Sequence, residues 1–579
     1  MNVRMKYTVS LVCATLLIAL MAGCGPSDDD GSLLGIQVYG WGPTAGGEVG
    51  FQQSMPLYEG ASFVQVRLTQ PGQGRIISSE NTQIDSRGVE IPETSYGDRL
   101  RFELSVLDSN LDPIASGATP LFDFEPNDTR KTFRMMVMPA NGFAPVGSLV
   151  QSGGQAVFQQ THFDFRSMST IDENAHLGRV GHAVVPVEER NKALVVGGVD
   201  VNSSRAPAEF PSVRRMHDDL QEFDPVSGYF TDLSYDPAAG APLENGGDRL
   251  AVPRAYHTVT PVGDQTYLVV GGLQERESGL EATDSVEFID LSAPAGERVQ
   301  PLVDAQGNPQ KLASARAFHT ATYRPADGMV VVAGGVGPGG PSDIVNTIEF
   351  IDVKNRTVEP RELEMSEGRA QHSAVLMDES TIWLIGGRDD ISALASTEKV
   401  QLSGSTTTTL AAAAMNTPRF DAAAIRISPG GGQNLMVIGG YTSLEGDVSA
   451  TYEFSTLRRT NFLRESSWKL QQGRGNLRVL ELPQTQNLVV LGGRDSAGTA
   501  VGAAEVLQFS DLGASPPYVA NETASTSYNG RADAEVMMLS NGKILMTGGI
   551  GSDDGQRTTL KVAEYFNPLD PITVSNDGM

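Results

Sequence analysis

Short apolar runs that end in a pair of glycines recur throughout residues 150–579. The pairs are Gly197-Gly198, Gly271-Gly272, Gly334-Gly335, Gly386-Gly387, Gly439-Gly440, Gly492-Gly493 and Gly548-Gly549. Their spacing is widest between the first three pairs and nearly even from Gly334 onward. Short apolar runs bounded by glycine predict short buried β-strands. Their recurrence predicts a repeat architecture rather than one continuous domain.

Two further landmarks keep step with the glycine pairs. An arginine precedes each pair, at Arg179, Arg254, Arg316, Arg369, Arg419, Arg474 and Arg531. At the third position after it, four copies carry a histidine, His182, His257, His319 and His372, and the others carry Ala422, Leu477 and Ala534. A glutamate lies in an apolar run after each pair, at Glu222, Glu287, Glu349, Glu398, Glu453, Glu505 and Glu564. This fixed order predicts seven copies of one structural unit.

The pattern resembles kelch repeats, especially the bacterial repeats related to the galactose oxidase propeller. That unit carries Arg-x-x-His, a strand, a strand followed by Gly-Gly, a strand with Glu and an outer strand with Trp. Trp468 is the clearest remnant of the tryptophan, which most copies lack. The resemblance implies an all-β fold with a seven-bladed propeller over residues 150–579. A lone blade cannot bury both faces, so the blades must pack in a ring.

The repeated glutamates are expected to be buried and to accept hydrogen bonds from backbone amides or from the repeated arginines. An unpaired buried charge would be costly. The last copy is short, because the chain ends at Met579, soon after Phe566. We therefore predict that the segment 155–166 adds the missing outer strand to the last blade and closes the ring. Closure would remove exposed sheet edges.

Residues 33–142 have the period of β-strands rather than helices. In Arg99–Val106, and again around Val64 and Val137, apolar residues alternate with polar ones, which predicts strands with one buried and one wet face. A stretch of such strands, of roughly the length of one small domain, predicts an Ig-like β-sandwich. The domain could be a binding module or a spacer, and the spacer is favoured because a sandwich alone implies no function.

The segment 1–24 has the three parts of an export signal. Arg4 and Lys6 precede an apolar run over 8–20, which is too short to span a bilayer stably. Ala22-Gly23-Cys24 follows and resembles the bacterial lipoprotein signal, although Met21 stands where that family prefers Leu. The resemblance implies a signal peptide over 1–23, lipidation of Cys24 and a flexible tether over 24–32. An ordinary secretory leader with a chance cysteine is the alternative.

The segment 1–24 also predicts where in the cell the protein is located. Several acyl chains give stable membrane attachment, so the protein is expected in the bacterial cell envelope. Gly25 stands where the enteric inner-membrane retention signal would place Asp, which favours the outer membrane. The face of that membrane, periplasmic or cell-surface, stays open. We expect a monomer.

Charge and cysteine content exclude several functions. The net charge of −27 leaves no basic footprint for nucleic acid. The two cysteines are Cys13 and Cys24, so lipidation takes the only thiol of the mature chain. Galactose oxidase-type enzymes need copper and a cysteine crosslinked to tyrosine, and that chemistry is therefore not expected. The four histidines could bind a metal, but equivalent positions in different blades favour a structural role. We predict no cofactor, metal or catalytic residues.

Three functions follow as alternatives. The first is a non-enzymatic, membrane-anchored protein that recognises a protein, peptide or glycan through one propeller rim. The long insertions 199–220 and 228–253, with Arg214–His217 in the first, are the candidate rim site. The second is a carbohydrate-active kelch enzyme, a sugar mutarotase or lyase, and the third is a structural envelope component. Arg, Glu and His gathered in the central channel would favour the enzyme, and a featureless channel would favour rim binding.

Overall fold

A computed structural model gives the fold of the chain. It describes residues 8–9, 34–43, 49–52, 58–70, 75–83, 89–90, 97–124, 131–152, 155–160, 178–201, 206–236, 241–242, 248–403, 406–427, 434–456, 459, 461–510, 517–525, 530–553, 556–560 and 562–568. The proposed signal peptide, Cys24 and tether lie outside the described residues, apart from Thr8 and Val9. The described part is all-β, with one short 3₁₀ turn at Glu188–Arg190.

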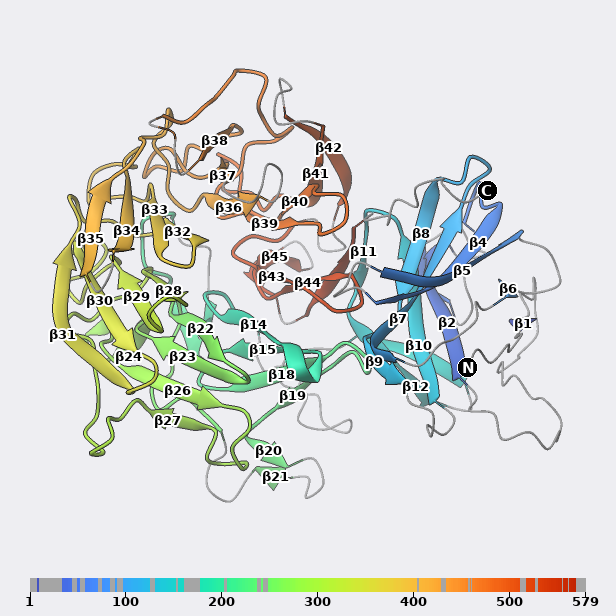
Figure 1. Cartoon of the computed structure of the whole chain (residues 1–579), viewed down its shortest axis with the longest axis horizontal. Helices are drawn as coiled ribbons and strands as arrows, with labels where there is room; N and C mark the ends of the chain where they lie inside the picture. Colours follow the sequence, from blue (N-terminus) through green and yellow to red (C-terminus); the bar gives the residue numbers. More distant parts are fainter. Residues whose placement is uncertain are drawn as a thin grey trace.

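Seven antiparallel sheets form a ring, seen at the left of Figure 1. Blades 1 to 3 consist of β14(Ala183–Val187), β15(Lys192–Val196), β18(Leu220–Asp224) and β19(Tyr229–Asp232); β22(Thr258–Gly263), β23(Thr266–Val270), β26(Val286–Asp290) and β27(Val299–Pro301); and β28(Thr320–Arg324), β29(Met329–Ala333), β30(Thr347–Asp352) and β31(Thr357–Glu364). Each blade runs in sequence order from the innermost strand outward.

Blades 4 to 6 repeat this order. They consist of β32(Ser373–Asp378), β33(Thr381–Ile385), β34(Thr397–Ser403) and β35(Thr406–Ala411); β36(Ala423–Ile427), β37(Asn434–Ile438) and β38(Tyr452–Thr456); and β39(Arg478–Glu481), β40(Leu488–Leu491), β41(Ala503–Phe509) and β42(Tyr518–Ser525). In blade 5 the outer position is taken by an isolated bridge between Phe454 and Leu463. The second strand of each blade is buried on both faces, which explains its continuous apolar sequence.

Blade 7 closes the ring with a strand from far away in the sequence. Its chain-terminal strands are β43(Glu535–Met538), β44(Ile544–Thr547) and β47(Glu564–Asn567), and its outer strand is β11(Gly142–Pro145), antiparallel to β47. The closing segment predicted at 155–166 is therefore wrong. In its place, β13(Gln155–Gln160) forms a hairpin with β12(Gly147–Ser152). Blade 7 thus includes a strand that precedes residue 150.

A small β-sandwich precedes the propeller and lies beside blade 7 (Figure 1). Its strands pair in the order β3(Val49–Gln52), β2(Leu34–Pro43), β10(Lys131–Pro139), β8(Pro113–Ala118), β7(Gly97–Leu107), β4(Phe63–Gln70) and β5(Arg75–Gln83), and β9(Phe122–Phe124) pairs with β7. The alternating apolar residues of β4 and β7 face one core with those of β9 and β10. β2 and β10 are parallel, and the other pairs are antiparallel.

The sandwich is fastened to blade 7 by buried contacts. Met136 and Met138 of β10 join the core cluster of blades 1 and 7. The Lys543 Nζ donates to the Met136 carbonyl at 2.7 Å, and the Asn567 side chain donates to the Met138 carbonyl at 3.1 Å. Lys543 is almost fully buried, and this burial lowers its pKa to about 7. The two domains therefore pack against each other through a shared hydrophobic core, in addition to the chain that connects them.

Small hairpins complete the described strands. They are β16(Val199–Val201) with β17(Val213–Met216), β20(Tyr235–Asp236) with β21(Ala241–Pro242), β24(Leu273–Arg276) with β25(Gly279–Ala282), β45(Ile550–Asp553) with β46(Gln556–Thr559), and β1(Thr8–Val9) with β6(Val89–Glu90). Three of these hairpins follow a glycine pair, so their loops lie on the same propeller face. No helix among the described residues is long and apolar enough to cross a membrane.

Candidate functional site in the propeller axis

The residue two positions after each repeated arginine has a left-handed backbone. These seven residues, with φ between 45° and 60°, are Gly181, Tyr256, Phe318, Gln371, Asp421, Asn476 and Asp533. We call them the axial ring. For any residue but glycine this conformation costs about 1–3 kcal/mol and persists only where the surroundings enforce it. Six of the seven positions hold a residue other than glycine and therefore have this unfavourable conformation.

Backbone hydrogen bonds between blades enforce this conformation. The Tyr256 N–H donates to the Gly181 carbonyl at 2.6 Å, and the Phe318 N–H donates to the Tyr256 carbonyl at 3.1 Å. The series continues from blade to blade through Gln371, Asp421 and Asn476, with distances of 2.8–3.0 Å. The left-handed turn directs each N–H toward the preceding blade. These bonds join six of the seven positions, from Gly181 to Asn476, in one backbone series that does not depend on the side chains.

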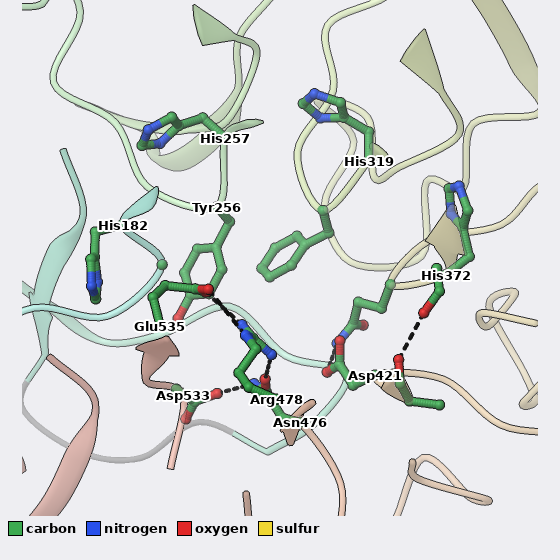
Figure 2. Close-up of a pocket in the computed structure, with 15 residues that line it drawn as sticks. His182, Tyr256, His257, His319, His372, Asp421, Asn476, Arg478, Asp533 and Glu535 are labelled. Atoms are coloured by element: carbon green, nitrogen blue, oxygen red, sulfur yellow. Dashed lines mark hydrogen bonds and ion pairs between the residues drawn. The ribbon is translucent and has the colours of Figure 1, made fainter. Parts of the chain in front are cut away.

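The axial ring surrounds a pocket of about 260 Å³. Beside the ring residues, its lining includes the four repeat histidines, Ser373, Arg478 and Glu535. Figure 2 shows Tyr256, Asp421, Arg478 and Glu535 from different blades around one space, with the labelled histidines at its edge. Ligand sites in proteins are typically such concave spaces with a few convergent polar groups. This pocket is the candidate functional site.

One arc of the ring is aromatic. Tyr256 and Phe318 stack with ring centroids 4.4 Å apart. Phe210, from the insertion of blade 1, extends the stack with its centroid 6.2 Å from that of Phe318. Three aromatic rings from blades 1 to 3 thus form one apolar wall beside the pocket.

The opposite arc is polar and internally hydrogen-bonded. The Gln371 Nε2 donates to the Asp421 carboxylate at 2.6 Å. The Asn476 amide donates to the Asp533 carboxylate, which also pairs with Arg494 behind it. Tertiary hydrogen bonds hold these side chains in place before any ligand arrives. Such preorganisation favours specific binding.

Arg478 and Glu535 form an ion pair across the interface of blades 6 and 7. Two guanidinium nitrogens of Arg478, Nε and Nη2, donate to the two Glu535 oxygens at 3.0 and 2.5 Å, and Nη1 donates to the Asn476 Oδ1 at 2.9 Å. Burial alone would lower the pKa of Arg478, but the Glu535 carboxylate, with Asp421 and Asp533 nearby, raises it overall. The arginine is a permanent cation that is already bound in a fork.

The repeat histidines pack between neighbouring blades. The Nε2 of His319 lies 3.1 Å from the Thr258 hydroxyl, and that of His372 lies 2.8 Å from the Thr320 hydroxyl. In each case the hydroxyl comes from the preceding blade. Burial, together with Arg369, lowers the pKa of His372 to about 3, and burial with Arg316 places the pKa of His319 well below its usual value. These imidazoles are therefore neutral at pH 7.

The glycine pairs leave space for these histidine side chains. A Cβ on Gly271 would lie 2.8 Å from the His319 Cε1 of the next blade, and a Cβ on Gly272 would lie 2.7 Å from the His257 Cβ of its own blade. Both glycines also have positive φ. The pair is thus required by close approach on two sides.

Six repeated glutamates pair with the repeated arginine of their own blade. The pairs are Arg254–Glu287, Arg316–Glu349, Arg369–Glu398, Arg419–Glu453, Arg474–Glu505 and Arg531–Glu564. Most of these glutamates also accept from backbone amides just before the arginine; Glu453, for example, accepts from the Asn416 and Thr417 amides at 2.6 and 2.9 Å. Arginine and glutamate together tie the blade-connecting segment to the third strand.

Glu222 does not share this role, which corrects its assignment to the repeat. Glu222 lies opposite Leu194 in the sheet of blade 1. In blade 2, Glu287 lies opposite Val269, and the residue of blade 1 at the equivalent position is Gln221, opposite Val195. A shift of one residue turns a side chain to the other face of a strand. Glu222 therefore contacts Lys192 and Arg190, and Arg179 pairs with Asp219 at 3.0 Å instead.

The predicted rim site lies partly over the pocket. Arg214, on β17, pairs with Asp200 at 3.5 Å, and His217 is buried 3.5 Å from Asp219, so neither lines the pocket. An earlier part of the same insertion reaches the axis. The Pro207 carbonyl accepts from the Gln371 Nε2 of blade 4 at 2.9 Å. The insertion of blade 1 thus crosses toward the polar arc.

Among the described residues, no three His, Cys, Asp or Glu side chains are grouped so that they could hold a metal ion. The predicted lipidation site Cys24 lies outside those residues, and its role stays a prediction.

The fold and its repeat contacts define a seven-bladed kelch-type β-propeller. No protein family model matches the chain, and no curated protein matches it. The solved structure of YjhT is 13% identical, with 59% of this chain and 97% of YjhT covered and a TM-score of 0.40. A fungal alcohol oxidase of the AA5 family, in complex with copper, is 15% identical, with 68% and 75% covered and a TM-score of 0.49. Neither likeness carries an argument about function.

Proposed function

We propose that the protein recognises a carbohydrate of monosaccharide size in its axial pocket. The observation that carries this proposal is the division of the axial ring into an aromatic arc and a polar arc. A pyranose has an apolar face of C–H groups and an edge of hydroxyl groups. The apolar wall formed by the ring edges of Tyr256 and Phe318 would contact the former, and the carboxylates and amides opposite would accept from the latter.

The size of the pocket supports a small ligand. Its volume of about 260 Å³ lies just below the roughly 300–1,000 Å³ typical of sites for drug-sized molecules. A protein surface or an extended peptide would need a larger and shallower face. The glycan branch of the predicted function is therefore preferred, with the site on the axis rather than on the outer rim.

Isothermal titration with common hexoses tests this proposal. Phe318→Gly removes an aromatic wall but suits the left-handed backbone, as Gly181 does at the equivalent position. It is expected to lower sugar affinity roughly tenfold, since apolar contact with the sugar is lost. Ile391→Ala, at a residue 77% exposed in a loop of blade 4, is the rim control and should bind normally. Loss of binding in the Ile391 variant alone would contradict the axial site.

A carbohydrate-active enzyme is the second candidate, and the Arg478–Glu535 pair favours it. Arg, Glu and His do gather in the channel, although the imidazoles serve the blade interfaces. Glu535 places a carboxylate at the edge of the pocket, where general acid–base catalysis on a sugar would need one. NMR of anomer exchange with the protein present is the test. Acceleration that Glu535→Gln abolishes would establish the enzyme, and its absence would leave a binding protein.

We also propose that Cys24 is lipidated and anchors a monomer to the outer membrane. The signal-like residues 8–24 support this proposal. Expression in bacteria with a radiolabelled fatty acid is the test. The wild-type chain should be labelled and sediment with outer membranes, whereas Cys24→Ser should be unlabelled. Equal labelling of the two chains would contradict the anchor.

A further inference from the structure

The insertion of blade 1 continues across the propeller axis, on the face where the glycine pairs lie. We call its residues 206–212 the crossing segment. Its Phe210 packs against the core of blades 2 and 3, and the carbonyl of its Pro207 accepts from the Gln371 amide of blade 4 at 2.9 Å. A Cβ on Gly446, in blade 5, would lie 3.8 Å from the Pro207 Cγ. A segment of blade 1 that reaches blades 2 to 5 must pass over the axis.

Side chains of the polar arc fill the pocket at this end. Gln371 and Asp533 both line the pocket, yet each is only 6% exposed. The Gln371 Oε1 accepts from the Arg388 Nε at 2.6 Å, and Asp533 pairs with Arg494. Both arginines directly follow a glycine pair, so they lie on the same face as the crossing segment. Hydrogen-bonded side chains thus occupy this end of the pocket at blades 4 and 7.

The aromatic arc fills the same end at blades 1 to 3. The Tyr256 ring lies against the backbone of blade 1, since a Cβ on Gly181 would lie 3.0 Å from three of its ring atoms. Phe318 stacks on the other side of Tyr256, and Phe210 of the crossing segment follows, with its centroid 6.2 Å from that of Phe318. A stack of rings therefore extends from blade 1 to the crossing segment.

The pocket continues in the other direction, along the innermost strands. The fifth position after each repeated arginine holds valine or alanine in all seven blades, from Val184 to Val536, and every one is partly exposed. An innermost strand has the second strand on one edge and the neighbouring blades on its faces, so this exposure comes from the axis. Two positions further on, Pro186, Pro261 and Arg426 are exposed. Solvent therefore reaches the pocket from this side.

From this geometry we infer that the ligand enters from the face opposite the glycine pairs and binds end-on, as a free monosaccharide or as the terminal unit of a sugar chain. A unit inside a chain has neighbours on two sides, and one side of the pocket is filled. The inference rests on the proposed function for the identity of the ligand and specifies its substrate class. The direction of entry can be tested without any sugar.

A single thiol in the pocket measures the direction of entry. Ser373→Cys places it in the lining, and the leaderless chain without Cys24 holds no other cysteine. Ala424→Phe narrows the valine and alanine passage, whereas Ala208→Phe adds the same bulk to the crossing segment on the opposite face. The rate of modification by a small methanethiosulfonate should fall roughly tenfold or more with Ala424→Phe and stay within about twofold with Ala208→Phe.

Thermal unfolding checks that these variants are folded. Ala321→Phe, at the equivalent position of blade 3, repeats the measurement if the Ala424 variant does not fold. A rate that falls only with Ala208→Phe, or with neither substitution, would overturn the inferred direction of entry.

Trisaccharides test the end-on mode with the hexose that binds most tightly in the titration. They carry this hexose at the non-reducing end, at the reducing end or only in the middle. At least one of the first two should bind within about threefold of the free hexose, and the third roughly tenfold or more weakly. Equal binding of the third would refute end-on recognition. If no hexose binds, the proposed function fails, while the thiol rates still decide the direction of entry.

Discussion

The Phe318 N–H donates to the Tyr256 carbonyl, and the rings of these two residues stack 4.4 Å apart. One relationship thus supplies both a backbone link of the axial ring and the aromatic wall of the pocket. The backbone contact needs a left-handed residue at each position but no particular side chain. Structure and specificity are therefore separable here, and a substitution can change one without the other.

Phe318→Gly and Phe318→Ala test that separation through stability. Both remove the same ring, but alanine must keep a φ of 54°, which is unfavourable for a residue with a Cβ. We expect Phe318→Gly to be at least as stable as Phe318→Ala in urea unfolding. In a regular helix or strand the order is reversed, and alanine is more stabilising than glycine by roughly 0.5–1 kcal/mol. An alanine variant clearly more stable than the glycine variant would contradict the enforced left-handed ring.

The register shift in blade 1 provides a matched pair of substitutions. Glu287→Gln breaks a fully buried pair with Arg254 and should destabilise the propeller by about 3–5 kcal/mol. Glu222→Gln makes the same chemical change at the corresponding sequence motif, but its partners Lys192 and Arg190 are about one-third exposed. It should cost about 1 kcal/mol or less. Equal losses in chemical unfolding would refute the register difference.

Ala183 explains why His257 has no hydroxyl partner among the residues that the structure describes. His319 and His372 each pair with a threonine that follows the preceding blade's histidine, and Ala183 holds that position before His257. Ala183→Thr should therefore raise the free energy of unfolding by about 1 kcal/mol. Ala183→Val, which adds similar bulk without a hydroxyl, is the control. Equal effects of Thr and Val would mean that packing, not the hydrogen bond, decides stability.

Lys543 predicts a pH dependence at the joint between sandwich and propeller. Its pKa is about 7 in the folded protein and near 10.5 in the unfolded chain, so only the unfolded state holds the proton between these values. The free energy of unfolding should then rise from pH 7 to pH 10, by an amount on the order of 2–5 kcal/mol. Below pH 7 both states are protonated, and this contribution to the slope disappears.

Lys543→Met should flatten that slope relative to the wild type. Lys311→Met, at a side chain 61% exposed, removes a lysine that folding leaves largely in water and should leave the slope as it is. Urea unfolding at several pH values measures both. Parallel pH profiles for wild type and the Lys543 variant would show that the buried lysine is not the source.

Much of the propeller could be predicted from the repeated motif. The glycine pair, the arginine and the strand glutamate are needed wherever two blades meet, so they recur and reveal the blade count. The closing strand Gly142–Pro145 carries no such mark, because a short segment with a glycine and a proline has little strand propensity. Its place depends on β47, which lies near the opposite end of the chain. The pattern at 155–166 is locally stronger, but β13 within it forms its own hairpin.

The axial pocket escapes sequence-based prediction for a related reason. Its ring residues stand two positions after the repeated arginine, where Gly181, Tyr256, Gln371 and Asp533 share neither size nor charge. A position that varies inside a fixed motif is the signal that could have found them. The Arg478–Glu535 pair could not be found this way, because it arises from two blades and only the ring brings the side chains together.

A crystal structure of the leaderless protein soaked with the hexose that binds it most tightly tests the central claim most directly. The account predicts sugar density on the propeller axis, with the ring against Tyr256 and Phe318 and its polar edge toward Asp421 and Glu535. The same soak with Phe318→Gly should leave the pocket without sugar while the axial ring stays intact. Sugar density on the outer rim with an empty axial pocket in the wild type would contradict the account.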